Sequence, residues 1–162
     1  MPVIRRLDKF PRMLRQRHPL LGCIPTSIVA VLNYYDSSPS YVDECTILDI
    51  FAGSDDPRNI SFAKAKEYFL DPYLGRNFSS VVYEKRDFTE WAQCVVDAVL
   101  ESAPPLISYA SGSASHVGAV VETNAAWLKV HDPAVGEFSP KSFSGLASGK
   151  KDDILVIRPL AD

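Results

Sequence analysis

The chain has 162 residues, a formal net charge of −3, 46% hydrophobic residues and 23% charged residues. This composition excludes a mainly disordered chain and a fibrous repeat, and the length suits one compact domain. No apolar run reaches the roughly 18 residues that a membrane-spanning helix needs. The slightly acidic balance argues against a dedicated nucleic-acid binder. We therefore expect neither stable membrane insertion nor a nucleic-acid partner.

Positive charge gathers in the first 18 residues, where six Lys or Arg side chains stand against one Asp, a balance of +5. We interpret residues 1–15 as a basic lead-in and 16–162 as a single domain. A basic arm can also bind an acidic partner, a membrane surface or nucleic acid. Pro11 and the arginines interrupt any apolar run of the length that a secretory signal contains. We expect a cytoplasmic protein, with non-classical secretion as the alternative.

The three cysteines are Cys23, Cys45 and Cys94. An odd, small number without an export signal does not indicate a disulfide framework. No Cys-x-x-Cys pair occurs, which excludes a zinc ribbon and a thioredoxin-type redox motif. Cys45 and Cys94 fall in predicted helices, where core packing is the expected role of a free cysteine.

The first two thirds of the chain have mainly helical patterns. Residues 25–35 are almost continuously apolar, which predicts a buried helix with Pro25 in its first turn. The other predicted helices cover 42–52, 61–71 (stopped by Asp71-Pro72) and 87–102, and a short strand covers 80–84.

After Pro104-Pro105 the patterns become those of strands. We predict strands over 106–109, 116–122, 127–131 and 154–157, with a hairpin turn at Asn124 and a loop-rich stretch over 135–150. Helices followed by consecutive strands indicate an α+β fold with an antiparallel sheet.

Two polar residues of the predicted hairpin should meet at one end of the sheet. His116 opens the first strand and Asp132 follows the end of the second. Antiparallel pairing therefore brings them side by side. Cys23 lies just before the first predicted helix, where unpaired N–H groups favour a thiolate.

Together these three residues are the parts of a nucleophilic thiol site. An imidazole can take the proton of a thiol and return it to a leaving group, and a carboxylate fixes the tautomer of the imidazole. The backbone N–H of Cys23 would be one donor to the oxyanion, and Gln16 is the only Gln or Asn upstream that could supply a second.

The run from Gln16 through Gly22-Cys23 to Asn33-Tyr-Tyr resembles the nucleophile helix of papain-fold cysteine peptidases. It is most similar to the bacteriocin-processing, double-glycine-leader peptidases, and the His116 strand and Asp132-Pro133 resemble their catalytic histidine strand and the Asp-Pro beyond it. The resemblance covers roughly residues 16–158.

This resemblance implies a papain-like fold, in which a helical lobe carries the nucleophile and a sheet lobe carries the histidine and aspartate. It implies Cys23 as nucleophile, His116 as base, Asp132 as orienting acid and Gln16 as oxyanion donor, acting on a peptide or protein without a metal or other cofactor. Ile24 stands where these families usually have Gly. Gln16 lies seven residues before the cysteine instead of six, so Arg17 or His18 are alternatives.

Other interpretations stay open at this point. His131 competes for the base role, although strand alternation turns it to the opposite face. His116, His131 and Asp132 could in principle ligate a metal. Tyr109 and Trp127 are expected to be core residues. The alternatives to a peptidase are an inactive peptide-binding module of the same fold, and an acyltransferase or deamidase with the same triad.

Overall fold

A computed structural model of the chain describes residues 5–6, 14–18, 21–35, 43–56, 58, 60–85, 87–111, 114–124, 126–142 and 153–160. These residues form helices packed on an antiparallel sheet, which confirms the predicted α+β class. None of the helices within these ranges has the length and apolar character that crossing a bilayer requires.

The sheet has seven strands in the order β2-β7-β3-β4-β5-β6, with β1 beside β4. The strands are β1 (Arg5–Arg6), β2 (Phe78–Glu84), β3 (Leu106–Ser111), β4 (Ala114–Thr123), β5 (Trp127–Asp132), β6 (Glu137–Ser142) and β7 (Asp153–Pro159). The helices are α1 (Cys23–Tyr35), α2 (Glu44–Ala52), α3 (Phe62–Ala65), a π-helical turn (Lys66–Leu70), α4 (Asp71–Leu74) and α5 (Phe88–Leu100).

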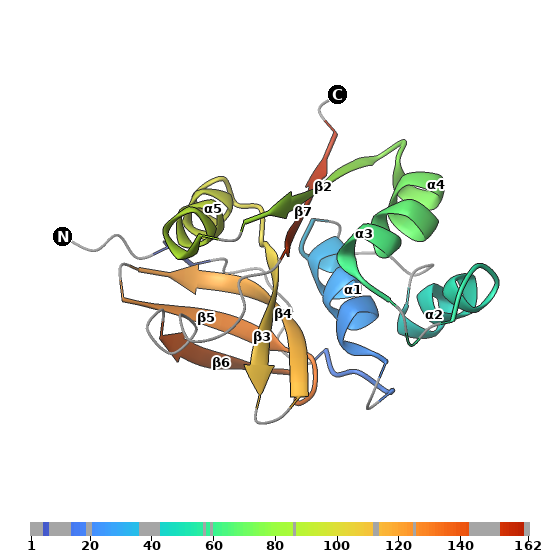
Figure 1. Cartoon of the computed structure of the whole chain (residues 1–162), viewed down its shortest axis with the longest axis horizontal. Helices are drawn as coiled ribbons and strands as arrows, with labels where there is room; N and C mark the ends of the chain where they lie inside the picture. The colour runs from blue at the N-terminus through green and yellow to red at the C-terminus, as the bar shows by residue number, and fades with distance from the viewer. Residues whose placement is uncertain are drawn as a thin grey trace.

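Helices cover both faces of the sheet (Figure 1). Helices α1 to α4 pack on one face, where Ile28 and Phe51 belong to the same apolar cluster as Val117. Helix α5 covers the other face, where Trp91 packs in a cluster with Val120. Because successive strand residues point to opposite faces, β4 contributes side chains to both clusters. This central strand therefore joins the two layers.

Helix α1 confirms the predicted buried helix but begins at Cys23, two residues earlier than expected. The residues from Ile24 to Leu32 are all buried, as a helix with apolar residues on every side requires. Pro25 falls in the first turn, where its missing N–H removes no helical hydrogen bond. The sheet lies directly against this helix, and the Ser27 hydroxyl reaches the Val117 carbonyl at 3.5 Å.

The predicted stop at Asp71-Pro72 is wrong, because helical structure continues to Leu74. A π-helical turn over Lys66–Leu70 precedes the proline, and the Asp71 N–H bonds the Lys66 carbonyl. The proline then falls in the first turn of α4, where the absence of an N–H is tolerated.

A sixth strand occupies part of the stretch predicted as loop. Strand β6 pairs with β5 from Asp132 opposite Glu137 to Trp127 opposite Ser142. Its polar sequence and its proline, Pro140, suit an edge strand, because an edge strand has one side without ladder partners. Residues 143–150 of the predicted loop lie outside the described residues.

The remaining predicted elements are confirmed with shifts at their ends. Asp43 and Asp87 cap α2 and α5, where each carboxylate accepts backbone N–H bonds from the first turn. The Asn124 side chain accepts the N–H groups of Ala126 and Trp127 at 2.8 and 3.0 Å, which stabilises the predicted turn between β4 and β5.

Candidate active site

The β4–β5 hairpin brings His116 and Asp132 together at one end of the sheet. The Nε2 atom of His116 lies 2.8 Å from Oδ1 of Asp132, although the two residues are 16 positions apart. Their side chains are 15% and 20% exposed. The pair is therefore screened from bulk water yet can be reached from solvent.

Gly118 makes this close approach possible. Ala119 of β4 stands opposite His131 of β5, so Gly118 faces the position of Asp132. A Cβ atom at Gly118 would lie 2.4 Å from Cγ1 of Val130 and 2.6 Å from the carbonyl oxygen of His131. A side chain here would push the two strands apart and break the contact between His116 and Asp132.

Cys23 is brought to the same end of the sheet by a helix, because it is the first residue of α1. The backbone N–H of Val117 lies close enough to its sulfur to lower the pKa of the thiol. Val117 directly follows His116 in β4, so the sulfur lies beside the strand that carries the imidazole. The structure thus brings the His116–Asp132 pair and the Cys23 sulfur to the same end of β4, but among the described residues no hydrogen bond joins the sulfur to the imidazole.

Burial raises the pKa of the Cys23 thiol above its ordinary value. Hydrogen bonds from the backbone N–H groups of Val117 and Ile24 lower it, and the negative charge of Asp132 raises it further. The expectation that the helix N-terminus favours a thiolate therefore holds in direction, but desolvation outweighs it. A neighbouring base that accepts the proton would offset this effect of burial.

Gln16 lies next to these residues, but its amide is already engaged. Its backbone N–H bonds the carbonyl of Pro133 at 2.7 Å, which fixes the segment beside the end of β5. Its side-chain Nε2 donates to the carbonyl of His18 at 2.6 Å. A role as oxyanion donor would require this side chain to rotate away from His18.

Glu44 is a structural residue of the site that the sequence did not indicate. It is only 7% exposed, and its carboxylate accepts the backbone N–H groups of Arg17 and His18 at 2.5 and 3.1 Å. The same carboxylate lies against Gly22, where a Cβ atom would overlap it. The loop that leads to Cys23 is therefore fixed by one buried acid, which in sequence looks like any acidic first-turn residue.

His131 is fully buried, and burial lowers its pKa to about 4. It is thus neutral near pH 7 and lies on the face of β5 opposite to Asp132, so the geometry favours His116 for the base role. Among the residues that the structure describes, no group of three or more His, Cys, Asp or Glu side chains is placed to hold a metal ion.

Two predictions about side-chain packing have different outcomes. Tyr109 is buried, as expected of a core residue. Cys45 is exposed, so the prediction that it packs in the core is wrong. The buried side of α2 carries Ile47, Leu48 and Phe51, which turns Cys45 toward solvent.

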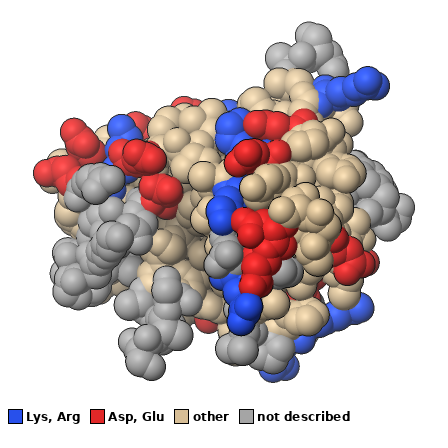
Figure 2. All heavy atoms as spheres, turned by 45° about the vertical axis from the view of Figure 1, so that its right-hand side comes forward, with Lys and Arg blue, Asp and Glu red and all other residues tan. Residues whose placement is uncertain are grey.

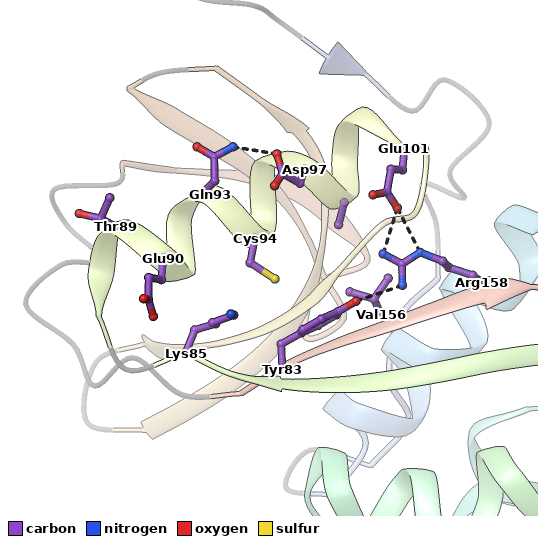
Figure 3. A pocket seen from close by; sticks show the side chains of 11 residues that line it. Tyr83, Lys85, Thr89, Glu90, Gln93, Cys94, Asp97, Glu101, Val156 and Arg158 are labelled. Carbon is purple, nitrogen blue, oxygen red and sulfur yellow. Dashed lines mark hydrogen bonds and ion pairs between the residues drawn. The ribbon is translucent and has the colours of Figure 1, made fainter.

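Cys94 is partly buried and points into a groove of about 540 Å³ between α5 and strands β2 and β7 (Figure 3). Two interactions order the polar groups around it: Glu101 forms an ion pair with Arg158 at 3.0 Å, and Asp97 accepts a hydrogen bond from Gln93 at 2.7 Å. Neither His116 nor Asp132 lines this groove, which is separate from the site.

The helical side of the molecule has a mixed surface charge. Figure 2 shows Lys and Arg side chains interspersed with Asp and Glu on the face that it displays. Ion pairs in the helical part of the chain include Lys64–Asp55 at 2.7 Å and Lys66–Asp71 at 3.0 Å. The view shows no continuous basic surface of the kind that binds a phosphate backbone.

No protein-family model matches the sequence, and no curated protein is similar to it at a significant level. The chemistry of the site therefore has to be inferred from its own geometry.

Proposed function

We propose that the chain is a cysteine peptidase of the papain fold that hydrolyses peptide bonds in a peptide or protein substrate. The observation that carries the proposal is the 2.8 Å contact between His116 and Asp132 beside the sulfur of Cys23. A thiol at the start of a buried helix and an imidazole paired with a carboxylate on the sheet are also the parts that the sequence resemblance implies.

The contact with Asp132 assigns separate roles to the two ring nitrogens of His116. Nε2 carries a proton toward the carboxylate, so Nδ1 is the nitrogen that can accept the proton of Cys23. The resulting imidazolium is stabilised by Asp132 and in turn stabilises the thiolate. This proton transfer overcomes the unfavourable effect of burial on ionisation of the thiol.

The reaction then proceeds in two halves. The thiolate attacks the carbonyl carbon of a peptide, and the imidazolium returns its proton to the amine as the C–N bond breaks, which leaves a thioester on Cys23. Water, deprotonated by His116, attacks the thioester, and the carboxylic acid and free thiol are released. The backbone N–H of Cys23 would donate to the oxyanion in both halves.

A peptide-binding module without turnover is the second candidate. Two observations favour it: burial raises the pKa of Cys23, and the amide of Gln16 is bound to His18. Such a module would use the same crevice but leave the thiol protonated.

Thiol reactivity separates the two candidates. We expect mild iodoacetamide treatment, followed by mass spectrometry, to label Cys23 faster than Cys45 at neutral pH. Cys45 is exposed whereas Cys23 is partly buried, so accessibility alone predicts the opposite order. Labelling of Cys23 that is slower than that of Cys45 would support the binding module.

Turnover tests the proposal directly. We expect Cys23→Ser and His116→Ala to abolish hydrolysis of unstructured peptides while the circular dichroism spectrum is retained. Asp132→Asn should keep a residual rate, because the orienting group is often less critical than the nucleophile. Hydrolysis that persists in Cys23→Ser would refute the assignment.

A further inference from the structure

Tyr109 is a buried aromatic residue that forms one wall of the proposed site. It lies in β3 directly opposite His116 of β4, and its side chain is 5% exposed. The two rings meet edge to face, with centroids 5.6 Å apart and an interplanar angle of 89°. The phenol ring therefore restricts the orientations that the imidazole can adopt.

The hydroxyl of Tyr109 has no hydrogen-bond partner among the described residues. A buried hydroxyl without a partner costs stability, because it has lost its bonds to water. If Tyr109 were only a core residue, phenylalanine would fill the same space without this cost. The hydroxyl is therefore expected to donate a hydrogen bond in another state of the site.

The position of the hydroxyl indicates its partner. A Cβ atom on Gly118 would lie 3.4 Å from it, so the phenol extends across the glycine that faces Asp132. Burial raises the pKa of Tyr109, and the negative charges of Asp132 and Cys23 raise it further. The phenol thus stays neutral.

Charged and titratable groups face Tyr109 from several elements. Cys23 of α1, His116 of β4 and Asp132 of β5 lie around it, and Nζ of Lys141 in β6 lies 5.0 Å from the centroid of its ring. Of these groups, Asp132 is the acceptor that stands across from Gly118.

We propose that Tyr109 is a positioning residue whose hydroxyl donates a hydrogen bond to Oδ2 of Asp132 when His116 holds the proton of Cys23. Oδ1 of Asp132 already accepts from Nε2 of His116 at 2.8 Å and from the backbone N–H of Ala134 at 3.0 Å, so Oδ2 is the oxygen for a further donor. This inference rests on the proposed function, since it concerns the charged state of the same site.

The physical reason is what Asp132 must do when His116 holds the proton of Cys23. Its carboxylate must stay ionised and in place beside an imidazolium, within a partly dry site. A hydrogen bond donated to an ionised carboxylate is stronger than one between neutral groups, so the phenol would help to hold Asp132 ionised and in place beside the imidazolium. Because Gly118 has no side chain, the phenol can lie across β4 at this position.

Tyr109→Phe tests this role, because it removes the hydroxyl and keeps the ring. We expect a melting temperature equal to or above that of the wild type, since the hydroxyl has no partner at rest. We also expect the acid limb of the pH profile of Cys23 alkylation to move up by about one pH unit, or about tenfold in rate near pH 5. The rate at pH 8 should change little.

Tyr35→Phe is the matched control. Its phenol is also sheltered, but it donates to the carbonyl of Ile157 at 2.6 Å, away from the site. This variant should lose stability and keep the wild-type acid limb. Together the pair of variants separates loss of a structural hydroxyl from loss of a positioning one.

The outcomes are distinct. An unchanged acid limb in Tyr109→Phe, with or without a lower melting temperature, overturns the positioning role while wild-type Cys23 remains reactive. If wild-type Cys23 reacts more slowly than Cys45, the proposed function itself fails, and this inference fails with it. A shifted limb with undiminished stability supports the role.

Discussion

The pH dependence of stability should be governed in part by His131, which lies in β5 next to the proposed site. This side chain is fully buried, and its pKa falls from 6.5 to about 4 because burial disfavours the charged form. The negative charge of Asp132 and a hydrogen bond with the backbone of Leu14 act in the opposite direction but are outweighed. Folding thus requires the neutral imidazole.

The sign of the effect follows from proton binding. Between pH 6.5 and about 4, the unfolded chain binds a proton on His131 that the folded chain does not. The contribution to stability is therefore complete above pH 6.5 and is lost as the pH falls toward 4. A shift of this size corresponds to about 3 kcal/mol in total, of which about 2 kcal/mol is lost between pH 7 and pH 5.

Urea denaturation followed by tryptophan fluorescence measures this contribution. We expect the free energy of unfolding of the wild type to fall from pH 7 to pH 5 by about 2 kcal/mol more than that of His131→Leu. Phe138→Leu is the control, because Phe138 packs against His131 with ring centroids 6.1 Å apart but does not titrate. It should keep the wild-type slope. Equal slopes in wild type and His131→Leu would refute the reasoning.

Three further predictions concern the loop before Cys23 and the capping of α5. Gly22→Ala should cost about 1–3 kcal/mol and slow alkylation of Cys23, because the new Cβ would overlap the Glu44 carboxylate and the His18 carbonyl; a wild-type melting temperature and alkylation rate would contradict this. Glu44→Ala should lower the free energy of unfolding by about 1–3 kcal/mol, since it leaves the N–H groups of Arg17 and His18 without their acceptor, and denaturation titrations would detect it. Asp87→Ala should lower the free energy of unfolding by about 1 kcal/mol through loss of the α5 cap, and Asp87→Asn should lower it much less. Equal losses of stability in the two variants, measured by calorimetry, would argue against a capping role.

Sequence patterns were sufficient where hydrophobic periodicity and turn residues agree. The apolar run after Pro25 and the alternation around Val120 predicted α1 and β4, and Asn124 marked the turn between β4 and β5. The same hairpin logic anticipated that His116 and Asp132 would meet, because strand order and direction alone determine which ends lie together.

The patterns failed where tertiary packing overrides local preference. Strand β6 is polar and contains Pro140, so nothing in its composition separates it from a loop; it becomes a strand because β5 offers a free edge. The helix continued through Pro72 because a π-helical turn adjusts the backbone just before it. Each outcome depends on contacts that no short window of sequence contains.

The same limit applies to the site. The residues that support it were harder to predict from the sequence than Cys23, His116 and Asp132. Reactive groups are recognisable by residue type, and this is how Cys23, His116 and Asp132 were selected. Glu44 supports the site through burial, which cannot be read from a local pattern of an acid. The burial of Tyr109 was predicted, but the contact of its ring with His116 depends on strand pairing.

Burial also links the chemistry of the site to its stability. Burial raises the pKa of Cys23, so under the proposed function the thiolate forms together with the imidazolium. Reactivity should then depend less on Cys23 itself than on how well the His116–Asp132 pair accepts and holds a proton. A change near this pair should therefore alter thiol reactivity more than an equally disruptive change near the N-terminus of α1.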